Sequence, residues 1–123
     1  MKKIFAVIAL LVITCSLTIA QQRQTVEERA THQTERLDKT VGLTDEQKNK
    51  IQAVNLDIAK QTEEQFGKNR GNREAMQTAL RKANAERDNK YKQILTDEQF
   101  KKYTEEKAKL EQELRNYRTQ RRR

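Results

Sequence analysis

The chain has 123 residues and a formal net charge of +8, and 36% of its residues are Asp, Glu, Lys or Arg. Only 34% are hydrophobic and 5% aromatic, which excludes a large globular core. There is no Pro, and no run of alternating Val, Ile or Thr occurs, whereas Gln, Glu, Lys, Arg and Ala are abundant. This composition predicts an all-α fold of long, thin helices that share a narrow apolar seam.

Residues 1–20 have the layout of a cleavable signal peptide. A basic start at residues 1–3 precedes a largely apolar stretch at residues 4–17, and residues 18–20 form an acceptable cleavage site before Gln21. The apolar stretch is shorter than the ~20 residues of a spanning helix, which favours cleavage over anchoring. Lipidation at Cys15 is the alternative, but Thr14 stands where lipoprotein signals carry Gly, Ala or Ser. The sequence therefore predicts a periplasmic protein with a single mature domain, residues 21–123, that contains no cysteine.

The first helix is predicted over residues 25–41, where Gly42 can end it in a left-handed conformation. One face of this helix carries Val26, Ala30, Gln33, Leu37 and Val41. His32 lies among polar residues in the same helix. Because a metal site needs several converging ligands, His32 is interpreted as a surface residue.

The second helix is predicted over residues 45–66, after the pentapeptide Leu43-Thr44-Asp45-Glu46-Gln47. Thr44 can accept a hydrogen bond from the third helical amide while Gln47 reaches back to the amide of Thr44, which is a capping box. One face carries Gln47, Ile51, Val54, Ile58, Thr62 and Gln65. Leu56 projects nearly opposite, as either a partner contact or an ordinary exposed leucine.

The third helix is predicted over residues 74–95, after a hairpin turn at residues 67–73 that contains two glycines. Its apolar face would be made of Met76, Leu80, Ala83, Arg87, Tyr91 and Ile94. This turn and helix place the second and third helices antiparallel.

The same pentapeptide returns 52 positions later, as Leu95-Thr96-Asp97-Glu98-Gln99, and starts the fourth helix. Leu95 and Phe100 have the spacing of a hydrophobic staple; Lys48 takes the equivalent place in the first copy, whose staple is weaker or uses Ile51. The predicted seam of the fourth helix consists of residues spaced three or four positions apart: Phe100, Tyr103, Lys107, Leu110, Leu114 and Tyr117. Lys107 either snorkels or marks the approach of a second subunit or client. The repeated pentapeptide, with Leu before both caps, predicts a duplicated structural unit.

Two LTxxQ motifs in a small, charged, helical and exported chain resemble the Spy/CpxP family of periplasmic proteins, over residues 21–123. The resemblance implies a bent helical hairpin of about four helices that dimerises into a cradle with a concave, often basic surface. It also implies an ATP-independent chaperone or envelope-stress role. The motif residues, Leu43, Thr44, Gln47, Leu95, Thr96 and Gln99, are interpreted as helix caps.

Basic residues gather in two regions, the hairpin and the carboxyl end. The carboxyl end carries Arg115, Arg118, Arg121, Arg122 and Arg123. Export makes nucleic acid an improbable partner of this charge. The first hypothesis is a chaperone that holds unfolded or partly folded envelope proteins on basic and apolar side chains, as a homodimer. The candidate contact residues are Leu56, Arg70, Arg73, Arg81, Lys82 and Arg87.

Two other classes of function are kept open. One is an adaptor or inhibitor that docks on the periplasmic domain of a membrane sensor, and the other is a structural protein with a weak contact to an anionic membrane surface. Catalysis finds no support, because HExxH, GxSxG and phosphate-loop patterns are missing and the carboxylates are typical of solvated helix faces. No catalytic residue, metal ligand or cofactor is predicted.

Overall fold

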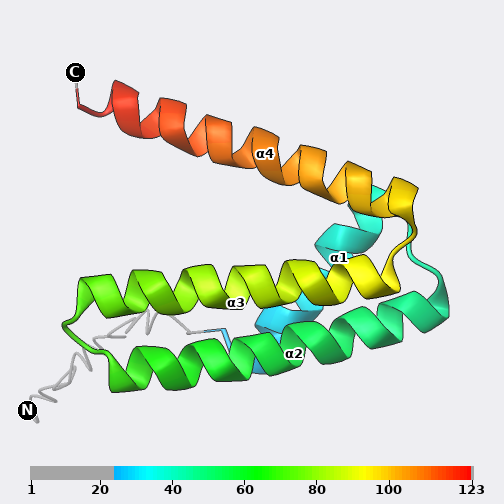
Figure 1. Cartoon of the computed structure of the whole chain (residues 1–123), viewed down its shortest axis with the longest axis horizontal. Helices are drawn as coiled ribbons and strands as arrows, with labels where there is room; N and C mark the ends of the chain where they lie inside the picture. Colours follow the sequence, from blue (N-terminus) through cyan, green and yellow to red (C-terminus); the bar gives the residue numbers. More distant parts are fainter. Residues whose placement is uncertain (1–23, 123) are drawn as a thin grey trace, which may run out of the picture.

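The computed structural model describes residues 24–122, which fold into four α-helices (Figure 1). They are α1 (Val26–Val41), α2 (Asp45–Lys68), α3 (Arg73–Ile94) and α4 (Asp97–Gln120). No strand occurs within this range, so the predicted all-α fold is confirmed. The predicted signal peptide lies outside the described residues.

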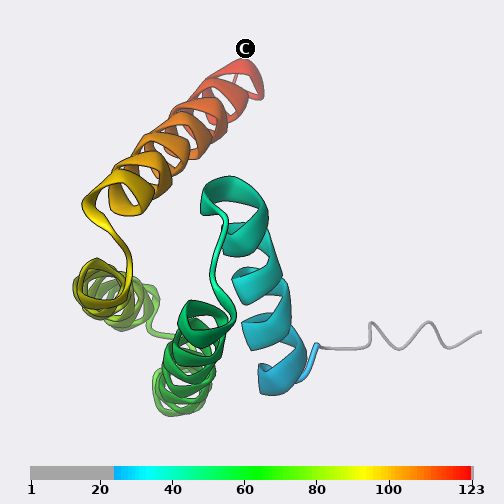
Figure 2. The same cartoon turned by 90° about the vertical axis from the view of Figure 1, so that its right-hand side faces the viewer.

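The helices α2 and α3 form an antiparallel hairpin, and α1 packs along α2 (Figure 1). Figure 2 views the molecule from the end where the two pentapeptides lie and shows α1 beside α2, with α4 apart from the α2–α3 hairpin. α4 contacts α1 and α3 over only a small part of its length. As a result the axes of α3 and α4 diverge toward the hairpin tip in the shape of a V (Figure 1).

The helix ends follow from local hydrogen bonds. Gly42 has a positive φ of 69°, and its amide donates to the carbonyl of Asp38 at 2.8 Å, which ends α1. The hairpin turn comprises residues 69–72, so the predicted turn at residues 67–73 was wrong by two residues at its start. The Asn69 side chain donates to the Gln65 carbonyl at 2.9 Å and carries α2 past Gly67, while Gly71, with φ 83°, makes the turn.

The apolar core lies at the end of the molecule that holds the two pentapeptides. Its buried members are Leu37, Val41, Ile51, Tyr91 and Leu95. Five half-buried residues pack around them: Leu43, Val54, Ile94, Phe100 and Tyr103. Burying each large side chain contributes roughly 1.5–3 kcal/mol, so this small cluster holds all four helices together at one end.

A chain of buried polar side chains crosses the first three helices. The Tyr91 hydroxyl donates to Asn55 Oδ1, Asn55 Nδ2 donates to Thr34 Oγ1 at 3.0 Å, and Thr34 Oγ1 donates to the Ala30 carbonyl at 2.8 Å. Burial raises the pKa of Tyr91 to about 12, so the phenol stays protonated and can donate. The chain fixes the register of α1, α2 and α3, because a slip would leave buried polar groups unpaired.

The predicted helix faces agree with the packing only in part. On α2, Asn55 and Ala59 are buried although the predicted face omits both, because α2 is covered by α1 on one side and α3 on another. Leu56 is half-buried rather than freely exposed. On α4 no residue within the described range is buried, and Leu110, Leu114 and Tyr117 are 37%, 49% and 58% exposed. The outer half of the predicted seam on α4 is therefore partly or largely exposed.

Candidate functional site

Both pentapeptides form capping boxes at the starts of α2 and α4. Thr44 Oγ1 accepts from the Gln47 amide at 3.2 Å, and Gln47 Oε1 accepts from the Thr44 amide at 3.0 Å. The same pair at α4 has Thr96 Oγ1 at 3.2 Å from the Gln99 amide and Gln99 Oε1 at 2.9 Å from the Thr96 amide. The acidic residues after each cap face the positive end of the helix dipole.

The two glutamines also bind each other across 52 residues of sequence. Gln47 Nε2 donates to Gln99 Oε1 at 2.7 Å, and Gln99 Nε2 donates back to Gln47 Oε1 at 3.0 Å. Each side-chain amide also donates a second hydrogen bond. Gln47 Nε2 donates to the Ile94 carbonyl at 3.3 Å, and Gln99 Nε2 donates to the Gly42 carbonyl at 2.7 Å. Gly42 and Ile94 each immediately precede a pentapeptide, so the arrangement has local two-fold symmetry.

We call this paired arrangement of Gln47 and Gln99 the glutamine clasp. Each side-chain oxygen accepts two hydrogen bonds and each side-chain nitrogen donates two, which uses the full capacity of both amides. The clasp therefore joins the start of α2 to the start of α4, and its residues are structural rather than available to a ligand.

A further brace fixes the loop between α1 and α2. Asp38 accepts from the Leu43 amide at 2.8 Å and pairs with Lys48 Nζ at 3.0 Å. The Leu43 amide and then the Lys48 ammonium hold the pKa of the Asp38 carboxyl below its usual value. Lys48 stands where the second copy has its staple residue, Phe100. It forms an ion pair with Asp38 at this position.

α4 is held to α3 by a separate group of contacts near its start. Asp88 accepts from the Tyr103 hydroxyl and from Lys107 Nζ, both at 2.7 Å, and the rings of Tyr91 and Tyr103 meet edge to face at 5.1 Å. Burial, followed by the Asp88 hydrogen bond, raises the pKa of Tyr103 above its usual value. Lys107 is therefore an intramolecular partner of Asp88, and its place in the seam needs no second subunit.

A groove of about 220 Å³ lies where α1, α3 and α4 meet, and we call it the α4 groove. Its floor includes Leu37 and Tyr91, its α4 wall includes Tyr103 and Leu110, and its charged lining consists of Arg36, Arg87, Lys107 and Glu106. The lining therefore combines apolar side chains with an excess of basic ones. The Arg87 Nε is buried without a hydrogen-bond partner within the described residues, although its Nη1 donates to Asn84 Oδ1 at 2.9 Å.

A second cleft, of about 590 Å³, lies between α2 and α3 near the hairpin tip. It is lined mainly by amide, hydroxyl and carboxylate side chains together with Ala75, Ala79, Ala83 and Lys82. Two of its carboxylates already have partners, since Glu64 pairs with Lys68 at 2.6 Å and Glu86 with Lys90 at 3.1 Å. This cleft is therefore closer to neutral than the α4 groove.

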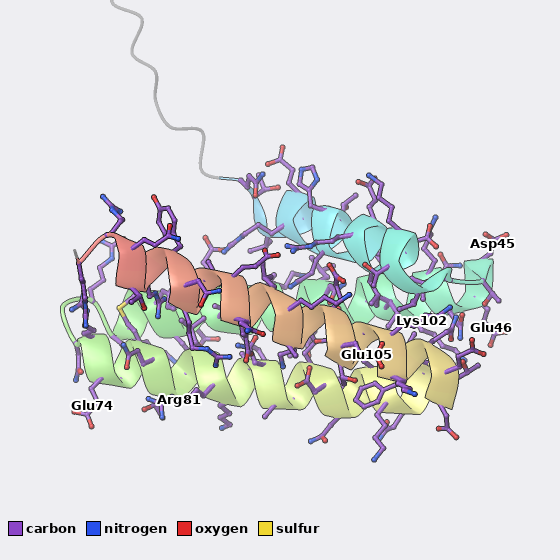
Figure 3. The ribbon with its side chains drawn as sticks, turned by 90° about the horizontal axis from the view of Figure 1, so that it is seen from above. Asp45, Glu46, Glu74, Arg81, Lys102 and Glu105 are labelled. Carbon is purple, nitrogen blue, oxygen red and sulfur yellow. The ribbon has the colours of Figure 1, made fainter. Side chains whose placement is uncertain are left out.

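The structure distributes the six predicted contact residues over several surfaces. Arg87 lines the α4 groove, Lys82 lines the α2–α3 cleft, and Arg70 and Arg73 are exposed at the hairpin tip. Figure 3 shows Arg81 on α3 with its side chain directed away from the helices. Leu56 is half-buried on α2. Only Arg87 among the six therefore lies beside apolar groove residues.

Several residues that shape the site were missed in the sequence. Asp88, Asn55 and Arg36 showed no signal, because their roles depend on which helices pack together. A third capping box at α1, in which Thr25 and Glu28 exchange hydrogen bonds of 3.1 and 2.9 Å, was readable from its Thr-x-x-Glu spacing. His32 is exposed and lies 3.9 Å from Glu35.

Among the described residues, no cluster of His, Cys, Asp or Glu side chains is placed to hold a metal ion. None of the four helices is long and apolar enough to cross a membrane.

Residues 18–103 match a protein family described as a domain of unknown function, DUF4890. The match takes in α1, α2, α3 and the start of α4, including both pentapeptides, and stops before the exposed leucines of α4. Neither the curated proteins nor the solved structures contain a match to this chain.

Proposed function

The chain belongs to the DUF4890 family, whose description names no activity, and from its own features we propose that it is an ATP-independent periplasmic chaperone. The observation that carries this proposal is the α4 groove, where Arg36, Arg87 and Lys107 surround apolar side chains beside the exposed Leu110. The activity is binding alone, without a catalytic residue, nucleotide or other cofactor.

The two LTxxQ motifs support the same proposal through their resemblance to the Spy/CpxP family, with which membership of DUF4890 is consistent. In this proposal the signal peptide of residues 1–20 exports the chain, and its clients are unfolded or partly folded envelope proteins. Cations on the groove attract clients at long range, and the apolar side chains add short-range contact. Release follows when a folding client buries its own apolar surface.

Aggregation of two unrelated client proteins, followed by light scattering without ATP, tests the proposal. We expect the chain from Gln21 onward to suppress both, and less so at high salt because screening weakens attraction between exposed charges. The double variant Arg36→Gln, Arg87→Gln should lose most of this effect. The matched control is Lys92→Gln, Lys101→Gln, which removes the same charge from exposed sites outside the groove. Equal activity of the two variants would remove the groove from the mechanism.

The second candidate is an adaptor or inhibitor that docks on the periplasmic domain of a membrane sensor. The basic lining of the α4 groove favours an acidic segment of such a domain. A dedicated adaptor binds one partner saturably and leaves unrelated aggregating proteins unprotected, so the scattering experiment separates it from a chaperone.

A homodimer is the expected form of the protein. Leu114 on α4 and Leu80 on α3 are exposed apolar side chains outside the α4 groove, which a second copy would cover.

A further inference from the structure

The excess of positive over negative charge is concentrated in two short segments of the chain. Residues 65–73 contain Lys68, Arg70 and Arg73 and no acidic residue, and residues 114–123 contain five arginines and no acidic residue. These eight basic side chains equal the formal net charge of +8, so all other residues taken together are neutral. The excess charge of the protein is therefore local.

The fold brings these two segments to the same end of the molecule. The first segment is the α2–α3 hairpin tip, residues 114–122 of the second form the end of α4 and the turn after it, and both lie at the end opposite the pentapeptides (Figure 1). Seen from above, Glu74 and Arg81 mark the tip end, whereas Asp45 and Glu46 lie at the far end (Figure 3). Acidic and basic residues are mixed at the far end, where Lys48 pairs with Asp38 and Lys50 with Glu46, so only the tip end has an excess of positive charge.

Helix ends alone do not account for this charge. The carboxyl ends of α2 and α4 carry about half a negative charge each, and the start of α3 at the same end offsets about half a positive charge. The sum of these partial charges is about half a negative charge, which is far less than the positive charge of the two segments. Arg70, Arg73, Arg115, Arg118, Arg121 and Arg122 are all exposed, and none has a carboxylate within ion-pair distance among residues 24–122.

The shape of the basic end indicates the kind of partner. It consists of two separate arms, because α4 diverges from α3 and its last turns stand apart from the hairpin tip (Figure 1). An extended anionic plane can touch both arms at once, whereas a compact acidic segment fits between helices rather than across two tips. Tyr117 is 58% exposed, and the Cζ atom of Arg121 lies 5.9 Å from the centroid of its ring. This residue adds an aromatic ring of the type that favours membrane interfaces.

We propose that the hairpin tip and the end of α4 together dock the protein, end-on, on the surface of an anionic phospholipid bilayer. This inference does not rest on the chaperone proposal. Contact is electrostatic and reversible, through the lipid phosphates. The far end, where Lys48 pairs with Asp38 and Lys50 with Glu46, carries no such excess of positive charge, so attraction to the bilayer acts on the basic end. In this orientation the α4 groove lies between the docked arms at one end and the glutamine clasp at the other. It is then open to the solution next to the bilayer.

Vesicle co-sedimentation tests the proposal with the chain from Gln21 onward, which includes every contact described above. We expect binding to vesicles of equal phosphatidylglycerol and phosphatidylcholine, and no binding to pure phosphatidylcholine. Each basic side chain near such a surface changes partitioning by about fivefold, so Arg118→Gln, Arg121→Gln, Arg122→Gln should weaken binding about a hundredfold. Lys68→Gln, Arg70→Gln, Arg73→Gln should act similarly, because both arms make contact.

The matched control is Lys39→Gln, Lys92→Gln, Lys101→Gln, which removes the same charge from exposed sites near the pentapeptide end. Circular dichroism should show an unchanged helical fold in all three variants. Near wild-type binding of the control, with loss in both arm variants, supports the proposal. Equal loss in the control would assign binding to net charge alone and overturn it. Binding to neutral vesicles, or sedimentation without vesicles through association of copies, would overturn it as well.

Discussion

At the scale of single residues, each of the repeated glutamines uses its side-chain amide for two separate sets of hydrogen bonds. Gln47 and Gln99 each complete a helix cap and also bind the opposite pentapeptide. A capping box needs only a residue that can accept a hydrogen bond from the cap amide, and Glu meets that need as well as Gln. Only Gln can also donate across the clasp, which explains why both copies carry an amide.

The clasp predicts a coupled loss of stability. Gln47→Ala removes one partner and leaves Gln99 and the Ile94 carbonyl with unmade hydrogen bonds, so we expect a loss of about 1–3 kcal/mol in the free energy of unfolding. Gln99→Ala should cost about the same, and the double variant clearly less than the sum. Urea denaturation measures all three. Gln61→Ala, which removes an exposed hydrogen bond to Asp57, is the control. Strict additivity would contradict the clasp.

At the scale of helices, the sequence predicts boundaries well and partnerships poorly. Thr44, Thr96 and Gly42 are local signals, and the starts of α2 and α4 and the end of α1 lie where these signals place them. The Asn55–Tyr91 and Asp88–Lys107 contacts join residues 36 and 19 positions apart in different helices. Periodicity within one helix carries no information about them. The α4 groove escaped prediction for the same reason, since three helices must be placed before it exists.

α4 behaves as two segments with different restraints. Its start is fixed by the clasp, by Phe100 in the core and by Tyr103 and Lys107 on Asp88, whereas Leu110 and Leu114 beyond are 37% and 49% exposed. Stability within a fold falls where buried contacts are few. The outer half of α4 is thus expected to open locally while the rest of the molecule stays folded.

Asp88 is the residue that limits this opening. Asp88→Asn keeps an acceptor for the Tyr103 hydroxyl and removes the ion pair with Lys107. We expect amide hydrogen exchange in residues 105–120 to rise about fivefold or more, on the basis of roughly 1 kcal/mol for a partly exposed pair, with little change in α1 or α2. Asp57→Asn, which removes the exposed pair with Lys90, should leave α4 unchanged. A uniform rise across all helices would instead indicate global destabilisation.

At the scale of the whole molecule, the two halves have the same order of elements, but their helices pack together to different extents. Each consists of a helix, a pentapeptide and a helix of 24 residues, α2 or α4. In the first half α1 lies along α2, while in the second α3 and α4 open apart (Figure 1). At equivalent positions, Ile58 on α2 is fully buried and Leu110 on α4 is 37% exposed. The second half thus presents the face that the first half covers.

A second copy of the chain would cover that face, and dimerisation would then show in the thermal stability. Because association stabilises only the folded state, we expect the Tm to rise with protein concentration. Leu80→Gln, Leu114→Gln should abolish this dependence while leaving the Tm at low concentration nearly unchanged, since both side chains are already partly solvated. Ala108→Gln, on a different face of α4 from Leu114, is the control. A Tm independent of concentration in the wild type would contradict dimerisation through these side chains.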